Sequence, residues 1–195
     1  MNPVTLVAGF VPLVLFALLD GAIPVAAAAA LAAAAAVVAF AAMVRRAVPV
    51  LPIVQAVTLA AVSALAFTGG PATQSFLTDY GRGLVSLVLA AYILATAGFA
   101  PFTAAFARAG VPREHWHSPR FIGLNRRISA AWGAAVLVLG VSHLLYGAVG
   151  ASLTRFEGLV LNWGLTIVAV LVAFRYTQRT IAAARTGAVR PPQGY

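Results

Sequence analysis

The sequence has no cysteine and no lysine, and it is poor in charged residues of either sign. Because cysteine is absent, disulfide bonds, thiolate metal sites and cysteine nucleophiles are excluded. Charged residues make up 9% of the 195 residues, whereas a soluble domain carries about 25%. Hydrophobic residues make up 62%, which excludes a disordered chain as well as a soluble enzyme. The composition therefore predicts a multi-pass membrane protein.

Long runs without charge predict about six membrane-spanning helices. A helix rises about 1.5 Å per residue and a bilayer core is about 30 Å thick, so a span needs about 20 apolar residues. The uncharged runs cover residues 4–19, 23–44, 48–67, 84–106, 128–149 and 159–174, of which the first and the last are marginal in length. The last span is predicted to extend to residue 176, because Tyr176 is an aromatic residue suited to the membrane interface. We expect an all-α helix bundle over residues 1–184, and a disordered cytoplasmic tail at 185–195.

The distribution of the arginines predicts the orientation of the chain. If the six segments cross the membrane in turn, eleven of the thirteen arginines lie on one side. Short arginine-rich loops stay in the cytoplasm, so both ends of the chain are predicted to be cytoplasmic, in a bacterial inner membrane. These arginines account for the formal net charge of +9. They are expected to contact anionic membrane lipids, and nucleic acid is not an expected partner.

The stretch between the third and fourth segments, residues 68–83, is predicted to be an outer turn. Gly69, Gly70 and Pro71 form a turn signal. Asp79 and Arg82 are three residues apart, so they could pair on the first turn of the following helix. The preferred interpretation is that both side chains are solvated at the membrane interface.

Glycine recurs every seven residues in the segment 128–149. Gly133, Gly140 and Gly147 therefore fall on one stripe of the predicted helix. Small residues let membrane helices approach closely. The stripe predicts a helix-packing surface.

Four polar side chains inside the predicted spans are candidates for an intramembrane site: His143, Asn162, Gln55 and Tyr92. Ionisable groups in a bilayer are costly and often functional. His143 and Asn162 lie at comparable depth on consecutive segments, so they could form a hydrogen bond. One interpretation is a proton or solute site, and the other, which we prefer, is a neutral histidine bound by a neighbouring helix.

The longest inner loop, residues 107–127, mixes aromatic and basic residues. This pattern is typical of a segment that lies at the lipid headgroups. Its main members are Trp116, Arg113, Arg120, Arg126 and Arg127. His115 and His117 lack evident further ligands, so no metal site is expected. No catalytic set is recognisable, and the chain is predicted to be non-enzymatic and without a cofactor.

Several short stretches resemble the bacterial intracellular septation protein A family. They are residues 10–16 (FVPLVLF), Leu124-Asn125, then Trp132, Gly140 and Tyr146, and finally Gly164-Leu165-Thr166 and Phe174-Arg175-Tyr176. The resemblance implies a small inner-membrane protein that acts in cell-envelope maintenance or septation through contacts with other membrane proteins. Self-association is a further possibility. The alternative is a small-solute transporter or channel with a polar site near His143 and Asn162.

Overall fold

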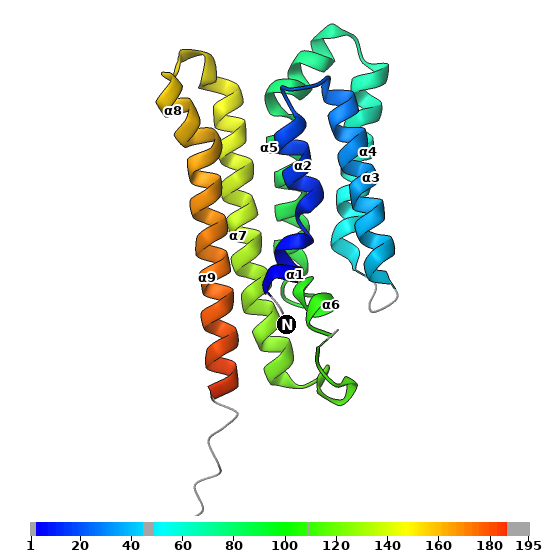
Figure 1. Ribbon diagram of the computed structural model, residues 1–195, viewed down its shortest axis with the longest axis vertical. Helices are drawn as coiled ribbons and strands as arrows, with labels where there is room; N and C mark the ends of the chain where they lie inside the picture. The colour runs from blue at the N-terminus through cyan, green and yellow to red at the C-terminus, as the bar shows by residue number, and fades with distance from the viewer. Residues whose placement is uncertain (1–2, 45–48, 109, 187–195) are drawn as a thin grey trace, which may run out of the picture.

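The computed structural model describes residues 3–44, 49–108 and 110–186, and these residues fold into helices joined by short turns (Figure 1). The helices are α1 (Pro3–Ala8), α2 (Val11–Leu19), α3 (Val25–Val44), α4 (Val50–Thr68), α5 (Pro71–Thr96), α6 (Thr103–Arg108), α7 (Pro119–Val149), α8 (Arg155–Leu159), a π-helix (Val160–Gly164) and α9 (Leu165–Thr186). Single 3-10 turns lie at Arg113–His115 and Gly150–Ser152. No strand occurs in these ranges, so the predicted all-α fold is confirmed.

Five helices are long and apolar enough to cross a membrane. They are Val25–Val44, Val50–Thr68, Pro71–Thr96, Pro119–Ser152 and Arg155–Ala184, the last two including short 3-10 and π segments. These five correspond to the second through sixth predicted segments, although several of their ends differ. Their length and composition identify a multi-pass membrane protein.

The first predicted segment, residues 4–19, is two short helices instead of one. The proline ring of Pro12 removes a backbone donor and clashes with the carbonyl four residues earlier, which interrupts the helix between α1 and α2. The carbonyl of Gly9 at this break accepts a hydrogen bond from Gln55 Nε2 at 3.2 Å. Together α1 and α2 still run along the bundle, and α1 begins toward the end at which α9 finishes (Figure 1).

The predicted outer turn at residues 68–83 is wrong over most of its length, because α5 already begins at Pro71. Pro71 stands at the start of the helix, where its missing N–H costs nothing. The same helix ends at Thr96 instead of continuing to residue 106, since Pro101 follows closely. The charge-free run 84–106 therefore placed the start of this 26-residue helix about half of its length too late.

Two other helices extend into predicted loops. In α7, the side chain of Ser118 caps the helix by accepting from Phe121 N at 3.2 Å, so residues 119–127 are helical. The last helix, α9, continues to Thr186. The rest of the predicted tail lies outside the described residues, as do residue 48 and both Arg45 and Arg46.

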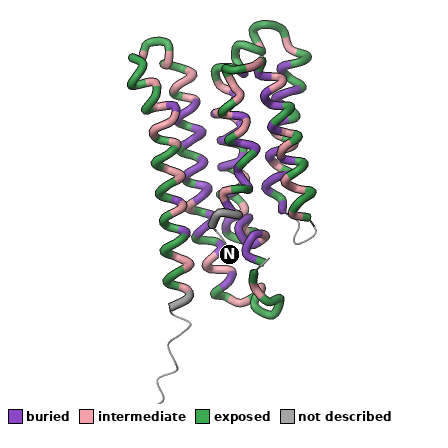
Figure 2. The backbone as a smooth tube through the Cα atoms, viewed as in Figure 1, coloured by how far each residue is buried: buried purple, intermediate pink, exposed green. Residues whose placement is uncertain are grey.

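The helices pair along the bundle as neighbouring hairpins. Figure 1 shows α3 beside α4 on one side, α7 beside α9 on the other, and α2 and α5 between them. The buried residues line the inner faces (Figure 2), and Leu51, Leu59, Leu89, Ile93 and Ile128 are fully buried. By contrast, α9 exposes apolar side chains such as Ile167, Val168 and Val172. In a bilayer these side chains face lipid.

The described arginines are concentrated at one end of the bundle. α6, the 3-10 turn Arg113–His115 and the first turns of α7 lie at the end where α9 finishes (Figure 1), and they carry Arg108, Arg113, Arg120, Arg126 and Arg127. We call this the basic end. Arg155 lies toward the opposite end. Because arginine-rich loops stay in the cytoplasm, this asymmetry favours the predicted orientation, in which the basic end is cytoplasmic.

Candidate functional site

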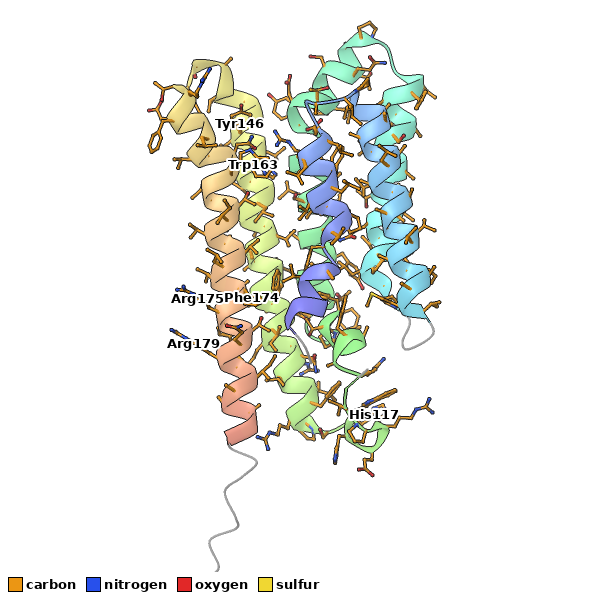
Figure 3. The ribbon with its side chains drawn as sticks, in the orientation of Figure 1. His117, Tyr146, Trp163, Phe174, Arg175 and Arg179 are labelled. Carbon is orange, nitrogen blue, oxygen red and sulfur yellow. The ribbon has the colours of Figure 1, made fainter. Side chains whose placement is uncertain are left out.

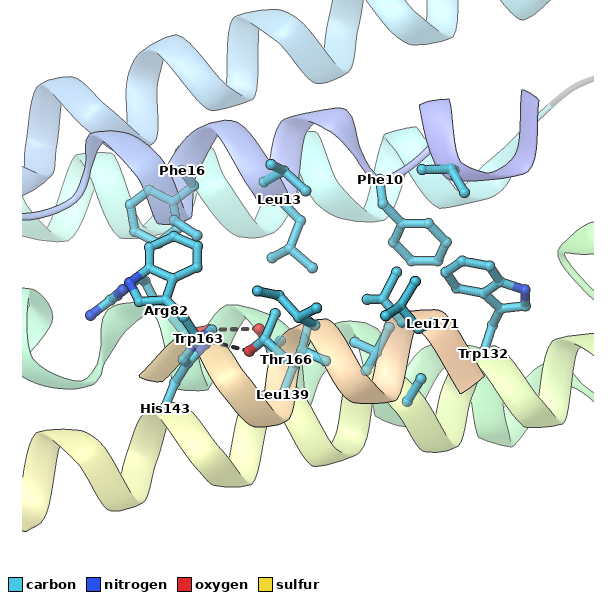
Figure 4. A pocket seen from close by; sticks show the side chains of 18 residues that line it. Phe10, Leu13, Phe16, Arg82, Trp132, Leu139, His143, Trp163, Thr166 and Leu171 are labelled. Carbon is cyan, nitrogen blue, oxygen red and sulfur yellow. Dashed lines mark hydrogen bonds between the residues drawn. The ribbon is translucent and has the colours of Figure 1, made fainter. Parts of the chain in front are cut away.

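An apolar cavity of about 300 Å³ lies between α2, α7 and α9 (Figure 4). Its walls include Leu13 of α2, Leu139 of α7 and Leu171 of α9. Arg82, Trp163 and His143 stand at one end in Figure 4, and Phe10 and Trp132 stand at the other. The volume is at the lower bound of about 300–1,000 Å³ that is typical of ligand pockets.

His143 and Asn162 lie next to each other at one end of the cavity, as the sequence predicted. The contact is from His143 Nε2 to the backbone carbonyl of Asn162, at 3.2 Å, and the Asn162 side chain takes no part in it. Because a carbonyl only accepts, Nε2 must carry the proton, which leaves Nδ1 as an acceptor. Nδ1 of His143 and Oδ1 of Asn162 are buried without a hydrogen-bond partner among the described residues.

The π-helix positions this carbonyl. Residues Val160–Gly164 make one wide turn, in which Leu165 N bonds to the carbonyl of Val160, five residues earlier. Such turns often occur at functional sites within helices. Thr166 Oγ1 also donates to the Asn162 carbonyl at 3.3 Å, and Ser142 Oγ donates to the carbonyl of Leu161. The last turns of α7 are thereby tied to this irregular stretch.

Arg82 pairs with Asp20, and not with Asp79 or solvent as the sequence suggested. Arg82 Nε lies 2.9 Å from Asp20 Oδ2, and the two side chains are 13% and 2% exposed. Asp79 is exposed on the same helix. Burial raises the pKa of the Asp20 carboxyl, and the positive charge of Arg82 opposes that rise. The pair joins the turn after α2 to α5 at the His143 end of the cavity.

Two aromatic rings close the other end. Phe10 and Trp132 stack with their centroids 5.1 Å apart and their planes 15° apart. Trp132 Nε1 donates to Thr177 Oγ1 of α9 at 3.0 Å, and both side chains are buried. This hydrogen bond holds α9 against α7 on the side of the cavity that faces the basic end.

Gln55 and Tyr92 lie elsewhere and do not line the cavity. Gln55 is fully buried, where its amide bonds to Gly9 at the break between α1 and α2. Tyr92 is partly buried and packs against the hydrophobic core. The four predicted polar candidates thus form one adjacent pair, His143 and Asn162, and two separate residues.

The glycine stripe of α7 packs against α5. A Cβ atom on Gly133 would lie 2.7 Å from Leu94 Cδ2, and one on Gly140 would lie 2.7 Å from Leu87 Cδ2. A Cβ atom on Gly147 would meet the backbone oxygen of Asp79. The predicted close packing is present, and it is used within the chain.

At the basic end, the aromatic-basic residues form an ordered corner. The guanidinium carbons of Arg108 and Arg113 lie 5.2 and 5.7 Å from the ring centroid of Trp116. Trp116 Nε1 donates to the Val111 carbonyl at 2.9 Å, and the ring packs against a small cluster that includes Phe121. We call Arg108, Arg113, Trp116 and the exposed residues between them the basic corner.

The other predicted loop residues surround this corner. Arg120 donates to the carbonyl of Ala184, which ties the start of α7 to α9. Arg126 and Arg127 are exposed on α7. Arg175 and Arg179 of α9 point away from the bundle, and His117 lies at the tip of the loop (Figure 3). No group of three His, Cys, Asp or Glu side chains able to hold a metal ion occurs in the described ranges.

Sequence reasoning missed the Asp20–Arg82 pair and the Trp132–Thr177 hydrogen bond. Both join residues that are far apart in the chain, and the only signal was the presence of Asp20 and Arg82 at the edges of apolar runs. Comparison with protein-family models, curated proteins and solved structures finds no match to this chain. The resemblance to septation protein A therefore stays a prediction.

Proposed function

We propose that the chain is a non-enzymatic multi-pass protein of the bacterial inner membrane, which acts through contacts with other membrane proteins in cell-envelope maintenance or septation. The observation that carries this proposal is the basic corner. It presents a tryptophan between two arginines on an exposed surface, held by a hydrogen bond and by packing. Tryptophan and arginine are the residues that most often dominate the energy of protein interfaces.

The side chains of the basic corner are held in place, which favours the binding of a partner protein. A side chain that is already fixed loses less rotamer freedom when a partner covers it, so more of the interaction energy remains as affinity. Arg113, Glu114 and His115 are exposed beside the ring. The excess of positive charge favours a partner with an acidic cytoplasmic segment. Nearby anionic lipids add about 1 kcal/mol per basic residue to the attachment of this end to the membrane surface.

The glycine stripe is a weaker candidate for the partner surface. Its three glycines are covered by Leu87, Leu94 and the backbone at Asp79, all on α5. A partner helix could reach them only by displacing α5. The process, septation or envelope maintenance, is supported by the resemblance in short stretches such as residues 10–16.

The test places a photo-cross-linking amino acid at Glu114, in the basic corner, and in a second strain at Phe156, which is exposed near the opposite end. We expect membrane proteins to be captured from Glu114 in living cells, and to be lost when Arg113→Glu reverses the charge of the corner. The Phe156 position is the matched control. If both positions capture the same proteins, or Glu114 captures lipid alone, the proposal is wrong.

Transport of a small solute is the second candidate, and the adjacency of His143 and Asn162 is what favours it. The cavity beside them has apolar walls, and Gln55 and Tyr92 lie outside it. The polar side chains that line the cavity, among them Arg82, Ser86, His143 and Thr166, are few, so a polar solute would pass mainly along apolar walls. Growth or uptake that depends on His143, with His143→Phe defective and His143→Gln active, would favour transport over protein contact.

A further inference from the structure

We infer that the cavity between α2, α7 and α9 holds one acyl chain of a membrane phospholipid, with the ester and phosphate end of that lipid beside Arg82. This inference rests on the cavity alone and does not depend on the partner proposed for the basic corner.

The shape of the cavity matches one extended hydrocarbon chain. Trp132 and His143, which line its two ends, are eleven residues apart on α7, or about 16 Å along the helix axis. A volume of about 300 Å³ over that length corresponds to a cross-section of roughly 20 Å². A channel this narrow admits a single polymethylene chain, and neither two chains nor a bulky ring system would fit side by side.

Water is a poor occupant of this space. Most of the residues that line it are apolar, among them Leu13, Val136, Leu139 and Val170. Ser86 and Thr166 also line it, but their hydroxyls donate to the backbone carbonyls of Arg82 and Asn162. A buried water needs two to four polar partners, and a cavity lined only by apolar side chains stays dry and takes up apolar molecules. If it were empty, its walls would lose the dispersion contacts that a filled core provides.

The cavity is continuous with the lipid-facing surface. Val14 of α2 and Ile167 and Leu171 of α9 line it, yet each of them is also about half exposed. These three residues mark a lateral mouth between α2 and α9. In a multi-pass protein that mouth opens on the hydrocarbon of the bilayer, so the molecules at the opening are lipid chains.

The hydrogen-bond donors of Arg82 place the lipid head at the Arg82 end. Arginine has five N–H donors, and Asp20 receives the one at Nε. The structure shows no hydrogen bond from the remaining donors to any of the described side chains or carbonyls. Arg82 lines the cavity close to the turn that follows α2 (Figure 4). Ester carbonyl and phosphate oxygens of a phospholipid are acceptors that these donors fit.

The first test measures quenching of Trp132 by phosphatidylcholine brominated in the middle of its acyl chains. Trp132 is 2% exposed, so the surrounding lipid does not contact its ring. The full chain carries Trp116→Phe and Trp163→Phe, which leaves Trp132 as the only tryptophan, and it is reconstituted in vesicles of brominated or unbrominated lipid. We expect brominated lipid to remove most of the Trp132 fluorescence.

Blocking variants make the test specific. Ala135→Phe fills the cavity from α7, while Ala134→Phe, on the exposed side of the same helix, is its control. Ile167→Phe narrows the mouth from α9, and the neighbouring exposed Val168→Phe is its control. We expect either blocking variant to reduce the quenching by more than half and the controls to retain it. Since Ile167 is half exposed, its variant keeps the test decisive if Ala135→Phe does not fold.

The second measurement identifies the lipid that stays bound when the full chain is extracted and analysed by native mass spectrometry. We expect one phospholipid per chain, with its retention lowered by Ala135→Phe and by the charge-neutral pair of substitutions Asp20→Asn and Arg82→Gln. Absence of Trp132 quenching, equal quenching in the blocking and control variants, or retention of a free fatty acid instead of a phospholipid would each overturn the inference.

Discussion

The two sides of α7 are packed in opposite ways. Toward α5, three glycines leave no room for a Cβ atom, because Leu94, Leu87 and the backbone at Asp79 lie directly against them. Toward α2 and α9, the same helix presents Ala135, Val136 and Leu139 to a cavity. One side is thus built for close contact and the other for an occupant. The difference shows that small residues alone do not identify a partner-binding surface in a membrane helix.

The largest effect is expected where the two sides meet, at Arg82, which belongs to α5 and also lines the cavity. Arg82→Met leaves the buried Asp20 carboxylate without its partner. Removing one member of a buried pair costs about 3–5 kcal/mol of the free energy of unfolding. This is measured by chemical unfolding in detergent, with the exposed Arg155→Met as control.

The pH dependence of that loss has a definite sign. Burial already raises the pKa of Asp20, and removal of Arg82 takes away the charge that opposes the rise. A carboxyl whose pKa is higher in the folded state stabilises the fold most when it is protonated. The destabilisation by Arg82→Met should therefore shrink as the pH falls. If Arg82→Met and Arg155→Met lower the free energy of unfolding equally at every pH, the Asp20–Arg82 pair contributes nothing to stability.

The next prediction tests the close packing of the α7 glycine stripe against α5. Gly147→Leu would push a side chain against the backbone oxygen of Asp79, and overpacking of this kind costs about 1–3 kcal/mol. Gly123→Leu on the same helix meets nothing within 4 Å and is the matched control. We expect thermal unfolding in detergent to report a large loss for the first variant only. Equal losses would mean that α5 and α7 do not pack through the stripe.

The smallest effect is expected on the cavity side of α7, where Trp132 contacts α9. Thr177→Val removes the acceptor for Trp132 Nε1, and the loss of a side-chain hydrogen bond between membrane helices costs about 0.6 kcal/mol on average. Thr180→Val, one turn further along α9, is the control. The same unfolding assay measures both variants. If Thr177→Val destabilises the fold more than Gly147→Leu does, the cavity side of α7 contributes more to stability than the glycine stripe, which would contradict the prediction.

Much of the architecture could be predicted from the sequence, because lipid-crossing helices must be long and uncharged. The long helices α3, α4, α5, α7 and α9, the glycine packing surface and the adjacency of His143 and Asn162 follow from run length and helical periodicity. The ends of α5 and α7 could not, since charges at residues such as Asp79 and Arg120 do not stop a helix. The Asp20–Arg82 pair and the cavity depend on how three helices meet, which no local pattern encodes.

The central claim is that the chain crosses a membrane with its basic end on one side and the turn after α7 on the other. Because the chain has no cysteine, a single cysteine at Glu114 or at Ser152 can be labelled with a membrane-impermeant maleimide in intact cells. We expect Ser152→Cys to react at once, and Glu114→Cys to react only after the membrane is permeabilised. Reaction of both positions in intact cells would contradict the account.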